Sequence, residues 1–252
     1  MCESRFVKFA AALAAATGLL APIPGAAAAD VKSLLREADA YRMVGDTARV
    51  ETEVRLFKGG ALDKERRYAV YVKPGRRSLV VFKSPAERGQ KLLMVGDDFW
   101  LVMPASQRPV RITPMQKLLG DASTGDIATL TWAEDYDGSI VGEEVAEGIP
   151  CLKLDISGQR KGVTYPRIVL YLAKAGHHPV LAELYVASDK LAKEARFRME
   201  TAEGRRQVGA MILTDRLQTA RETEIRYLSR KAKSLGDEFY NPAFLIRAEI
   251  DE

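Results

Sequence analysis

Most of the chain after residue 46 consists of short segments in which apolar and polar residues alternate. Between residues 49 and 56 the apolar side chains occupy every second position and charged side chains lie between them, a period of two that is typical of a half-buried strand. The glycine and proline pairs Gly59-Gly60 and Pro74-Gly75 then separate two further segments, 66–72 and 78–82, as hairpin turns do. The pattern predicts a meander of antiparallel strands.

The middle of the chain differs because its strands are apolar on both sides. Residues 92–95 and 99–103 form unbroken apolar runs around the turn at residues 96–98, so both faces of this part of the sheet must be covered. No helices of 10 to 15 residues alternate with the strands, which favours an antiparallel over a parallel sheet. We expect about eleven strands in total. The remaining six are 148–154, 168–172, 180–186, 191–199, 208–214 and 222–228.

Helical segments are few and short. Apolar residues at three- and four-residue spacing predict one amphipathic helix over residues 31–41. Two shorter helical turns are expected at Pro114–Leu119 and near Asp237–Phe244. These cannot cover one whole face of so long a sheet, and a twisted sheet of this size tends to curl. The expected result is either a concave apolar groove that holds a ligand or a sheet that closes on itself around a dry core.

The first 29 residues have the pattern of a secretory signal peptide. A basic start with Arg5 and Lys8 precedes an apolar run at residues 9–20 and small residues at 26–29. The apolar run is shorter than a membrane span of about 18 to 20 residues, so we expect cleavage near Ala29 and no stable membrane insertion. The mature chain, residues 30–252, is predicted to be a single exported domain, which places it in the periplasm.

Charge and cysteine content exclude several functions. Without the signal the chain keeps 38 − 2 = 36 basic and 34 − 1 = 33 acidic side chains, a mild excess that is interspersed along the sequence and does not favour a nucleic-acid partner. The loss of Cys2 leaves Cys151 without a disulfide partner. Because Cys151 lies in an alternating strand with apolar neighbours, we expect a buried structural cysteine.

No arrangement of residues nominates an active site, a metal site or a cofactor site. His177 and His178 are adjacent in sequence and point in opposite directions in an extended chain, so a turn is the simpler interpretation. Asp135 and Asp137 could bind a hard cation, although the sequence after them does not complete a calcium loop. Solvated carboxylates in a loop or at the start of a hairpin are therefore the favoured interpretation. The sequence therefore favours a binding protein over an enzyme, with no cofactor and no metal.

An apolar groove would be lined by strand residues and by the short helical turn. Trp100 and Val102 share one side of their strand, where the indole is either a core side chain or part of the lining. Thr113 and Pro114 are a suitable N-cap and first residue for a short helix that could act as a lid or as a fixed plug. The complete predicted lipid-binding set is Val54, Leu56, Leu93, Val95, Trp100, Val102, Met115, Leu118, Leu119, Trp132 and Tyr136.

Three consecutive stretches of the sequence carry a resemblance to a known family. Residues 89–95, 99–104 and 108–112 are similar to the exported, LolA-like family of outer membrane lipoprotein-sorting proteins. The likeness is specific up to Glu144, continues less strongly to Arg216 and covers most of the mature chain. It implies a half-barrel, in which a few helices cover the concave side of a strongly curved antiparallel sheet and an apolar cavity lies between them.

The resemblance also implies a function. Similar proteins are taken to be periplasmic carriers that bind lipid or the acyl chains of lipoproteins and move them between envelope membranes. Some are thought to work beside an inner-membrane transporter of the resistance-nodulation-division type. A periplasmic sensor or adaptor that binds a protein partner is the alternative, and an enzyme is the least favoured class.

Overall fold

The computed structural model describes residues 30–43, 45–106, 108–215 and 221–250, so the expected signal peptide lies outside the described residues. Thirteen strands form one antiparallel sheet: β1 (Ala48–Lys58), β2 (Ala61–Lys73), β3 (Arg77–Phe82), β4 (Lys91–Val95), β5 (Asp98–Val102), β6 (Val110–Ile112), β9 (Tyr136–Ala146), β10 (Ile149–Gly158), β11 (Arg167–Ala173), β12 (Pro179–Tyr185), β13 (Leu191–Ala202), β14 (Arg205–Thr214) and β15 (Arg221–Lys231). The other elements are the two-stranded β7 (Lys117–Leu119) and β8 (Ala122–Ser123), the helices α1 (Val31–Ala40), α2 (Thr124–Ala128) and α3 (Pro242–Leu245), and the 3₁₀ turns η1 (Pro85–Glu87) and η2 (Asp237–Tyr240).

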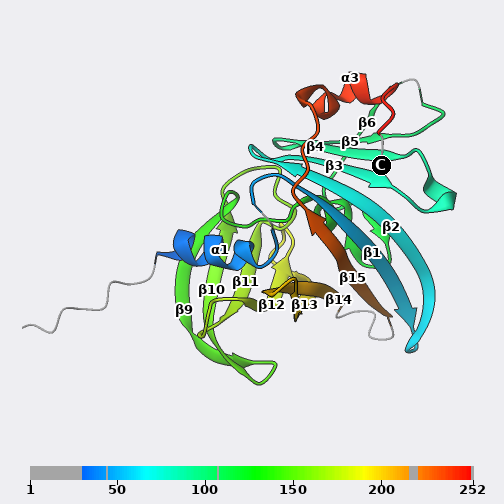
Figure 1. Cartoon of the computed structure of the whole chain (residues 1–252). Helices are drawn as coiled ribbons and strands as arrows, with labels where there is room; N and C mark the ends of the chain where they lie inside the picture. Colours follow the sequence, from blue (N-terminus) through cyan, green and yellow to red (C-terminus); the bar gives the residue numbers. More distant parts are fainter. Residues whose placement is uncertain (1–29, 44, 107, 216–220, 251–252) are drawn as a thin grey trace, which may run out of the picture.

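The large sheet is built from two meanders that meet at the pair β1–β15. Its strand order is β6-β5-β4-β3-β2-β1-β15-β14-β13-β12-β11-β10-β9, and across the junction Val54 lies opposite Ile225. Among the described residues β6 and β9 do not pair with each other, so the sheet curls without closing (Figure 1).

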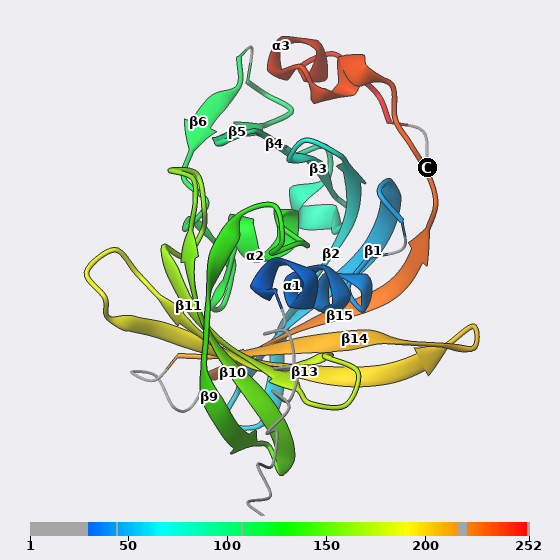
Figure 2. The same ribbon diagram turned by 90° about the vertical axis from the view of Figure 1, so that its left-hand side faces the viewer.

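Helices lie on both sides of this curved sheet. Viewed from the side, α1 and α2 lie inside the hollow that the strands enclose, whereas α3 lies outside, against β4 and β5 (Figure 2). The sequence-based prediction of a mainly β half-barrel with few helices on its concave face is therefore confirmed. Within the described residues no helix has both the length and the apolar character needed to cross a bilayer.

Four strands were not expected from the sequence: β6, β7, β8 and β9. Three of them have only two or three residues, which is too few to show the two-residue alternation of apolar and polar side chains. The fourth, β9, has eleven residues, most of them exposed, because it is an edge strand that lacks a covered face. Glu143 and Glu144 in β9 place charge along this edge, as edge strands commonly do to resist pairing with other chains.

The helical turn expected at Pro114–Leu119 is wrong. Residues 117–119 form β7 instead, and the helix of this region is α2, which begins at Thr124. Tertiary hydrogen bonds explain the difference: the Pro114 carbonyl accepts from the Gly125 N–H at 2.9 Å and from the Thr124 hydroxyl at 2.9 Å. These bonds, together with a turn in which the Gln116 N–H donates to the Thr113 carbonyl at 3.1 Å, hold residues 113–116 against the start of α2, so the local helix signal of Thr113-Pro114 is overridden.

The opening helix and the C-terminal helical turns are confirmed. Asp30 caps α1 by accepting a hydrogen bond from the Lys32 N–H at 3.2 Å, and the apolar stripe of α1, including Leu34 and Leu35, is fully buried. Cys151 is also buried and unpaired, as expected. Burial raises the pKa of its thiol, which makes Cys151 a poor nucleophile at neutral pH.

Candidate functional site

The concave face of the sheet carries the largest apolar cluster among the described residues. Strands from both meanders contribute to it, and α1 packs onto it. The rest of its cover comes from residues 113–135, called here the cover segment, which run between β6 and β9 and contain β7, β8 and α2. The apolar side chains that the cover segment buries are Leu119, Ala122, Ile127, Ala128, Leu130 and Trp132.

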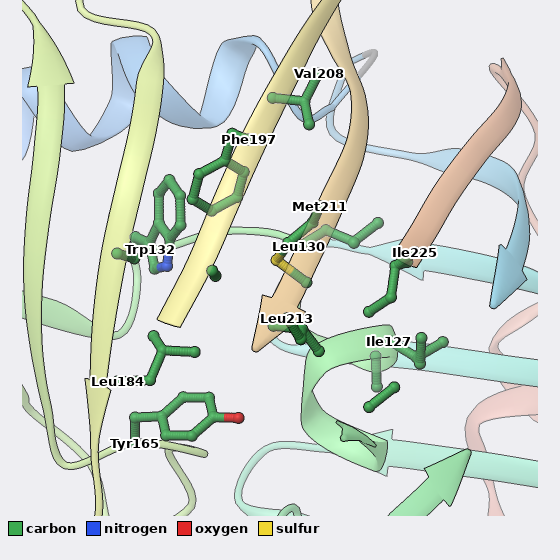
Figure 3. Packing of buried hydrophobic residues seen from close by; sticks show 14 of the residues in the cluster. Ile127, Leu130, Trp132, Tyr165, Leu184, Phe197, Val208, Met211, Leu213 and Ile225 are labelled. Atoms are coloured by element: carbon green, nitrogen blue, oxygen red, sulfur yellow. The ribbon is translucent and has the colours of Figure 1, made fainter. Parts of the chain in front are cut away.

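Side chains of the cover segment and of the sheet interdigitate (Figure 3). Trp132 meets Phe197 of β13 edge to face, with ring centroids 5.7 Å apart, and Leu130 and Ile127 lie beside residues of β14 and β15 such as Met211 and Ile225 (Figure 3). The cover segment thus fills space that the sheet alone would leave as an open apolar groove.

Little free volume remains inside. A void of about 40 Å³ lies between the end of α1, the cover segment and strands β11 to β14, whereas ligand pockets typically measure about 300 to 1,000 Å³. Its apolar lining is formed by Trp132, Ile168, Ala182, Leu184, Ala195, Phe197 and Met211. An acyl chain could enter this interior only if the cover segment moved.

A larger cleft of about 550 Å³ opens at one end of the hollow, between α1, the β2–β3 turn and the cover segment. Its floor is apolar and includes Met94 and Leu130, so it adjoins the core. Its walls carry the charged side chains Arg36, Asp39, Asp46, Lys73, Arg76, Arg77, Glu134, Asp135 and Arg205. We call this cleft, which opens beside the concave face, the entrance cleft.

A buried ion pair attaches α2 to the sheet. Lys193 of β13 donates to the Asp126 carboxylate at 2.7 Å and to the Asp121 carbonyl. The same carboxylate accepts from the Tyr165 hydroxyl at 2.8 Å and from the Ser123 N–H at 2.8 Å. Burial works to raise the pKa of Asp126, but the Lys193 charge and these hydrogen bonds outweigh it and hold that pKa below its usual value. Asp126 is therefore an anion at neutral pH.

Two further polar contacts hold the other end of the cover segment. Asp39 of α1 accepts from the backbone N–H groups of Trp132 and Ala133, both at 2.8 Å, and burial raises the pKa of Asp39 to about 7. Arg76, just before β3, forms a buried ion pair with Asp135. The cover segment is thus fastened by polar groups that lie in an apolar surrounding, where each depends on its partner.

The structure separates the predicted lining residues onto the two faces of the sheet. Five of them belong to the concave cluster, and Leu118 packs against it: Val54, Leu56, Leu119, Trp132 and Tyr136. Four lie on the convex face, where the C-terminal segment covers them: Leu93, Val95, Trp100 and Val102. Met115 is exposed. The unbroken apolar runs predicted that both faces of the sheet are covered in this part of the chain. They did not predict which side chains point to the concave face.

The candidate cation ligands do not converge. Asp135 is buried against Arg76, whereas Asp137 is exposed, and no group of three or more His, Cys, Asp or Glu side chains in the described part of the chain could hold a metal ion. His177 lies at a turn with φ +52°, as its position before His178-Pro179 predicted.

Sequence reasoning missed Arg42, Asp126, Tyr165 and Lys193, which form the polar interior. Two signals were present. Lys193 shares its side of the strand with Ala195 and Phe197, so a charged residue occupies an inward position. Ser123 and Asp126 have capping-box spacing, which marks the start of α2.

Comparison with known proteins places this geometry in context. A model of a family described as uncharacterized proteins matches residues 75–247. The structure of a LolA superfamily protein from Nitrosomonas europaea is similar at a TM-score of 0.78 and 28% identity, over 85% of this chain and 98% of that one. No curated protein matches the sequence.

Two other solved structures are similar over nearly their whole length. A DUF1329 family protein from Desulfovibrio piger has a TM-score of 0.68 and 25% identity, over 85% of this chain and 97% of that one. An outer membrane lipoprotein-sorting protein domain from Vibrio parahaemolyticus has a TM-score of 0.67 and 20% identity, over 86% and 98%. At that identity the last comparison supports the fold alone.

Proposed function

The chain belongs to the family whose model matches residues 75–247 and is LolA-like in structure, and from this premise we propose that it is a periplasmic carrier that binds lipid or lipoprotein acyl chains between its curved sheet and its cover segment. The family is one of carriers and binding proteins and not of enzymes. Transfer of the cargo between envelope membranes, beside an inner-membrane transporter of the resistance-nodulation-division type, is part of the same proposal.

One observation carries the proposal: the apolar concave face is covered by a segment with little regular structure that is fastened by polar tethers. Helix α2 has five residues, which is too short to be stable without its contacts. Movement of the segment would expose a continuous apolar surface, and an acyl chain could replace the side chains of Ile127, Leu130 and Trp132 against the sheet.

The energies involved are of a suitable size. Burial of each methylene yields roughly 0.8 kcal/mol, so a chain of about 16 carbons gains on the order of 10 kcal/mol before ordering costs. Opening the cover segment exposes apolar surface and separates two buried ion pairs, which opposes this gain. Closure of the cover segment would therefore favour release of the cargo to an acceptor.

A disulfide that locks the cover segment shut provides the test. A Cβ placed on Gly120, in the β7–β8 turn, would lie 3.5 Å from the Cβ of Thr223 in β15, within the range of about 3.5 to 4.5 Å that a disulfide spans. The variant is Gly120→Cys/Thr223→Cys in a Cys151→Ala background. The methyl end of Leu56, 2.8 Å from that Cβ, has to shift.

Uptake of a fluorescent fatty acid is measured for the oxidised and the reduced form of this one variant, so that both forms share every substitution. We expect the reduced form to take up the probe and the oxidised form to lose uptake at least tenfold. Equal uptake by both forms would show that the chain does not enter beneath the cover segment. Absence of uptake in both forms and in the wild type, with no lipid in an organic extract of the purified protein, would contradict the carrier function itself.

A further inference from the structure

Arg42, two residues after α1, is a buried cation that, unlike Lys193 and Arg76, forms no ion pair with a carboxylate. It is 4% exposed, and its guanidinium lies 4.1 Å from the centre of the Trp132 ring. Its Nη2 donates to the Thr129 carbonyl at a long 3.5 Å. Its Nε and Nη1 have no hydrogen-bond partner among the described residues.

The other buried cations in the hollow have carboxylate partners. Lys193 is paired with Asp126 and Arg76 with Asp135. No carboxylate of the described chain lies within ion-pair distance of Arg42, and Asp39 uses its oxygens on the backbone of the cover segment. An arginine does not release its proton, so this charge remains. Burying a guanidinium with two uncommitted nitrogens is costly, so these two nitrogens are available to an oxygen acceptor from outside the chain.

The surroundings of Arg42 define the rest of that ligand. Arg42 lines the 40 Å³ void, which has room for a small group such as a carboxylate. Beyond it the lining is apolar and includes Leu184, Phe197 and Met211. Asp126 lies in the same lining, but its oxygens accept from Lys193, Tyr165 and Ser123, so it does not compete for Arg42.

We propose that Arg42 binds the carboxylate of a long-chain fatty acid whose alkyl chain lies along the sheet beneath the cover segment. This inference rests on the proposed carrier function and narrows its cargo to an amphiphile with an anionic head. Arg42 lies at the end of α1, next to Met43 in the wall of the entrance cleft, so the head group would remain near the opening while the alkyl chain extends inward. Nε and Nη1 donate the charge-assisted hydrogen bonds.

The test compares palmitic acid with hexadecanol, which has the same chain length and no charge. A hydrogen bond to a charged group contributes about 1.5 to 3 kcal/mol, so the wild-type protein should bind palmitate about tenfold to a hundredfold more tightly, as measured by isothermal titration calorimetry. Arg42→Met should abolish this preference and leave the affinity for hexadecanol unchanged. Arg198→Met, an exposed arginine on the convex face, is the matched control and should keep the preference.

Thermal unfolding of the ligand-free variants separates a binding role from a structural one. Arg42→Met removes a buried charge that forms no ion pair, so its melting temperature should equal or exceed that of the wild type. A fall in melting temperature with the palmitate preference intact would show that Arg42 serves the fold alone. Equal wild-type affinities for palmitate and hexadecanol would overturn the anionic cargo while leaving the carrier in place. Absence of binding by either compound would overturn both.

Discussion

Over strands β2 to β5 both faces of the sheet are covered, but in different ways. On the convex face, residues 235–250 pack Phe239, Tyr240 and Leu245 onto strands β2 to β5, and their ion pair of Asp237 with Arg77, at 2.9 Å, is exposed. On the concave face the cover segment is fastened by buried ion pairs and adjoins an internal void and a wide cleft. The convex cover behaves as part of the fold, whereas the concave cover has the features of a part that exchanges with cargo.

The largest expected effect comes from breaking the buried tether. Lys193→Met leaves the Asp126 carboxylate buried without its counter-ion and should lower the free energy of unfolding by about 3 to 5 kcal/mol, measured by urea denaturation. Lys153→Met removes an exposed pair with Glu144 and should cost less than about 1 kcal/mol. If the two variants lose equal stability, Asp126–Lys193 does not fasten the cover segment.

The second effect sharpens the comparison between the two covers. Leu245→Ala on the convex face and Leu130→Ala in the cover segment each remove a buried leucine and should lower the free energy of unfolding by about 2 to 5 kcal/mol. Only Leu130→Ala weakens the part that competes with cargo, so it alone should raise the affinity for palmitate in calorimetry. A similar change of affinity in Leu245→Ala would show that the two covers are equivalent.

A smaller effect is the pH dependence that Asp39 imposes. Its pKa is about 7 in the folded protein against 3.8 for the ordinary group, so the folded state holds a proton that the unfolded chain releases. Stability from this group is complete below about pH 4 and is lost as the pH rises to 7 and beyond, by on the order of 2 kcal/mol between pH 5 and 8. In Asp39→Asn the midpoint of urea unfolding should vary less with pH over this range. If the midpoint varies with pH as it does in the wild type, Asp39 is not the source of the pH dependence.

The smallest effect is spectroscopic. The chain has two tryptophans: Trp132 in the cover segment on the concave face, and Trp100 of β5 on the convex face. In Trp100→Phe, palmitate should shift the emission of Trp132. In Trp132→Phe, the emission of Trp100 should stay constant. A shift from Trp100 alone would move the cargo to the convex face.

The sequence predicted the sheet well where strands are central and poorly where they are marginal. The eleven expected strands are present because a period of two is strong in strands with a buried face, as in β1 and β13. The edge strand β9 has no such face, so its pattern carried no signal. The helix expected at Pro114–Leu119 failed because bonds from Thr124 and Gly125, ten residues further on, decide the conformation there.

By itself, the sequence determined that this is a curved antiparallel sheet with too few helices to cover it, because hydrophobic periodicity and turn residues are local properties. Only the tertiary structure decided which apolar side chains face the hollow, since Leu93 and Trp100 are as apolar as Val54 and Leu56 but point to the other side. It also decided the pairing of Asp126 with Lys193 and left Arg42 without a carboxylate. Ion pairs are fixed by distance in space: Asp126 and Lys193 are 67 positions apart in the chain, and two nitrogens of Arg42 have no hydrogen-bond partner among the described residues.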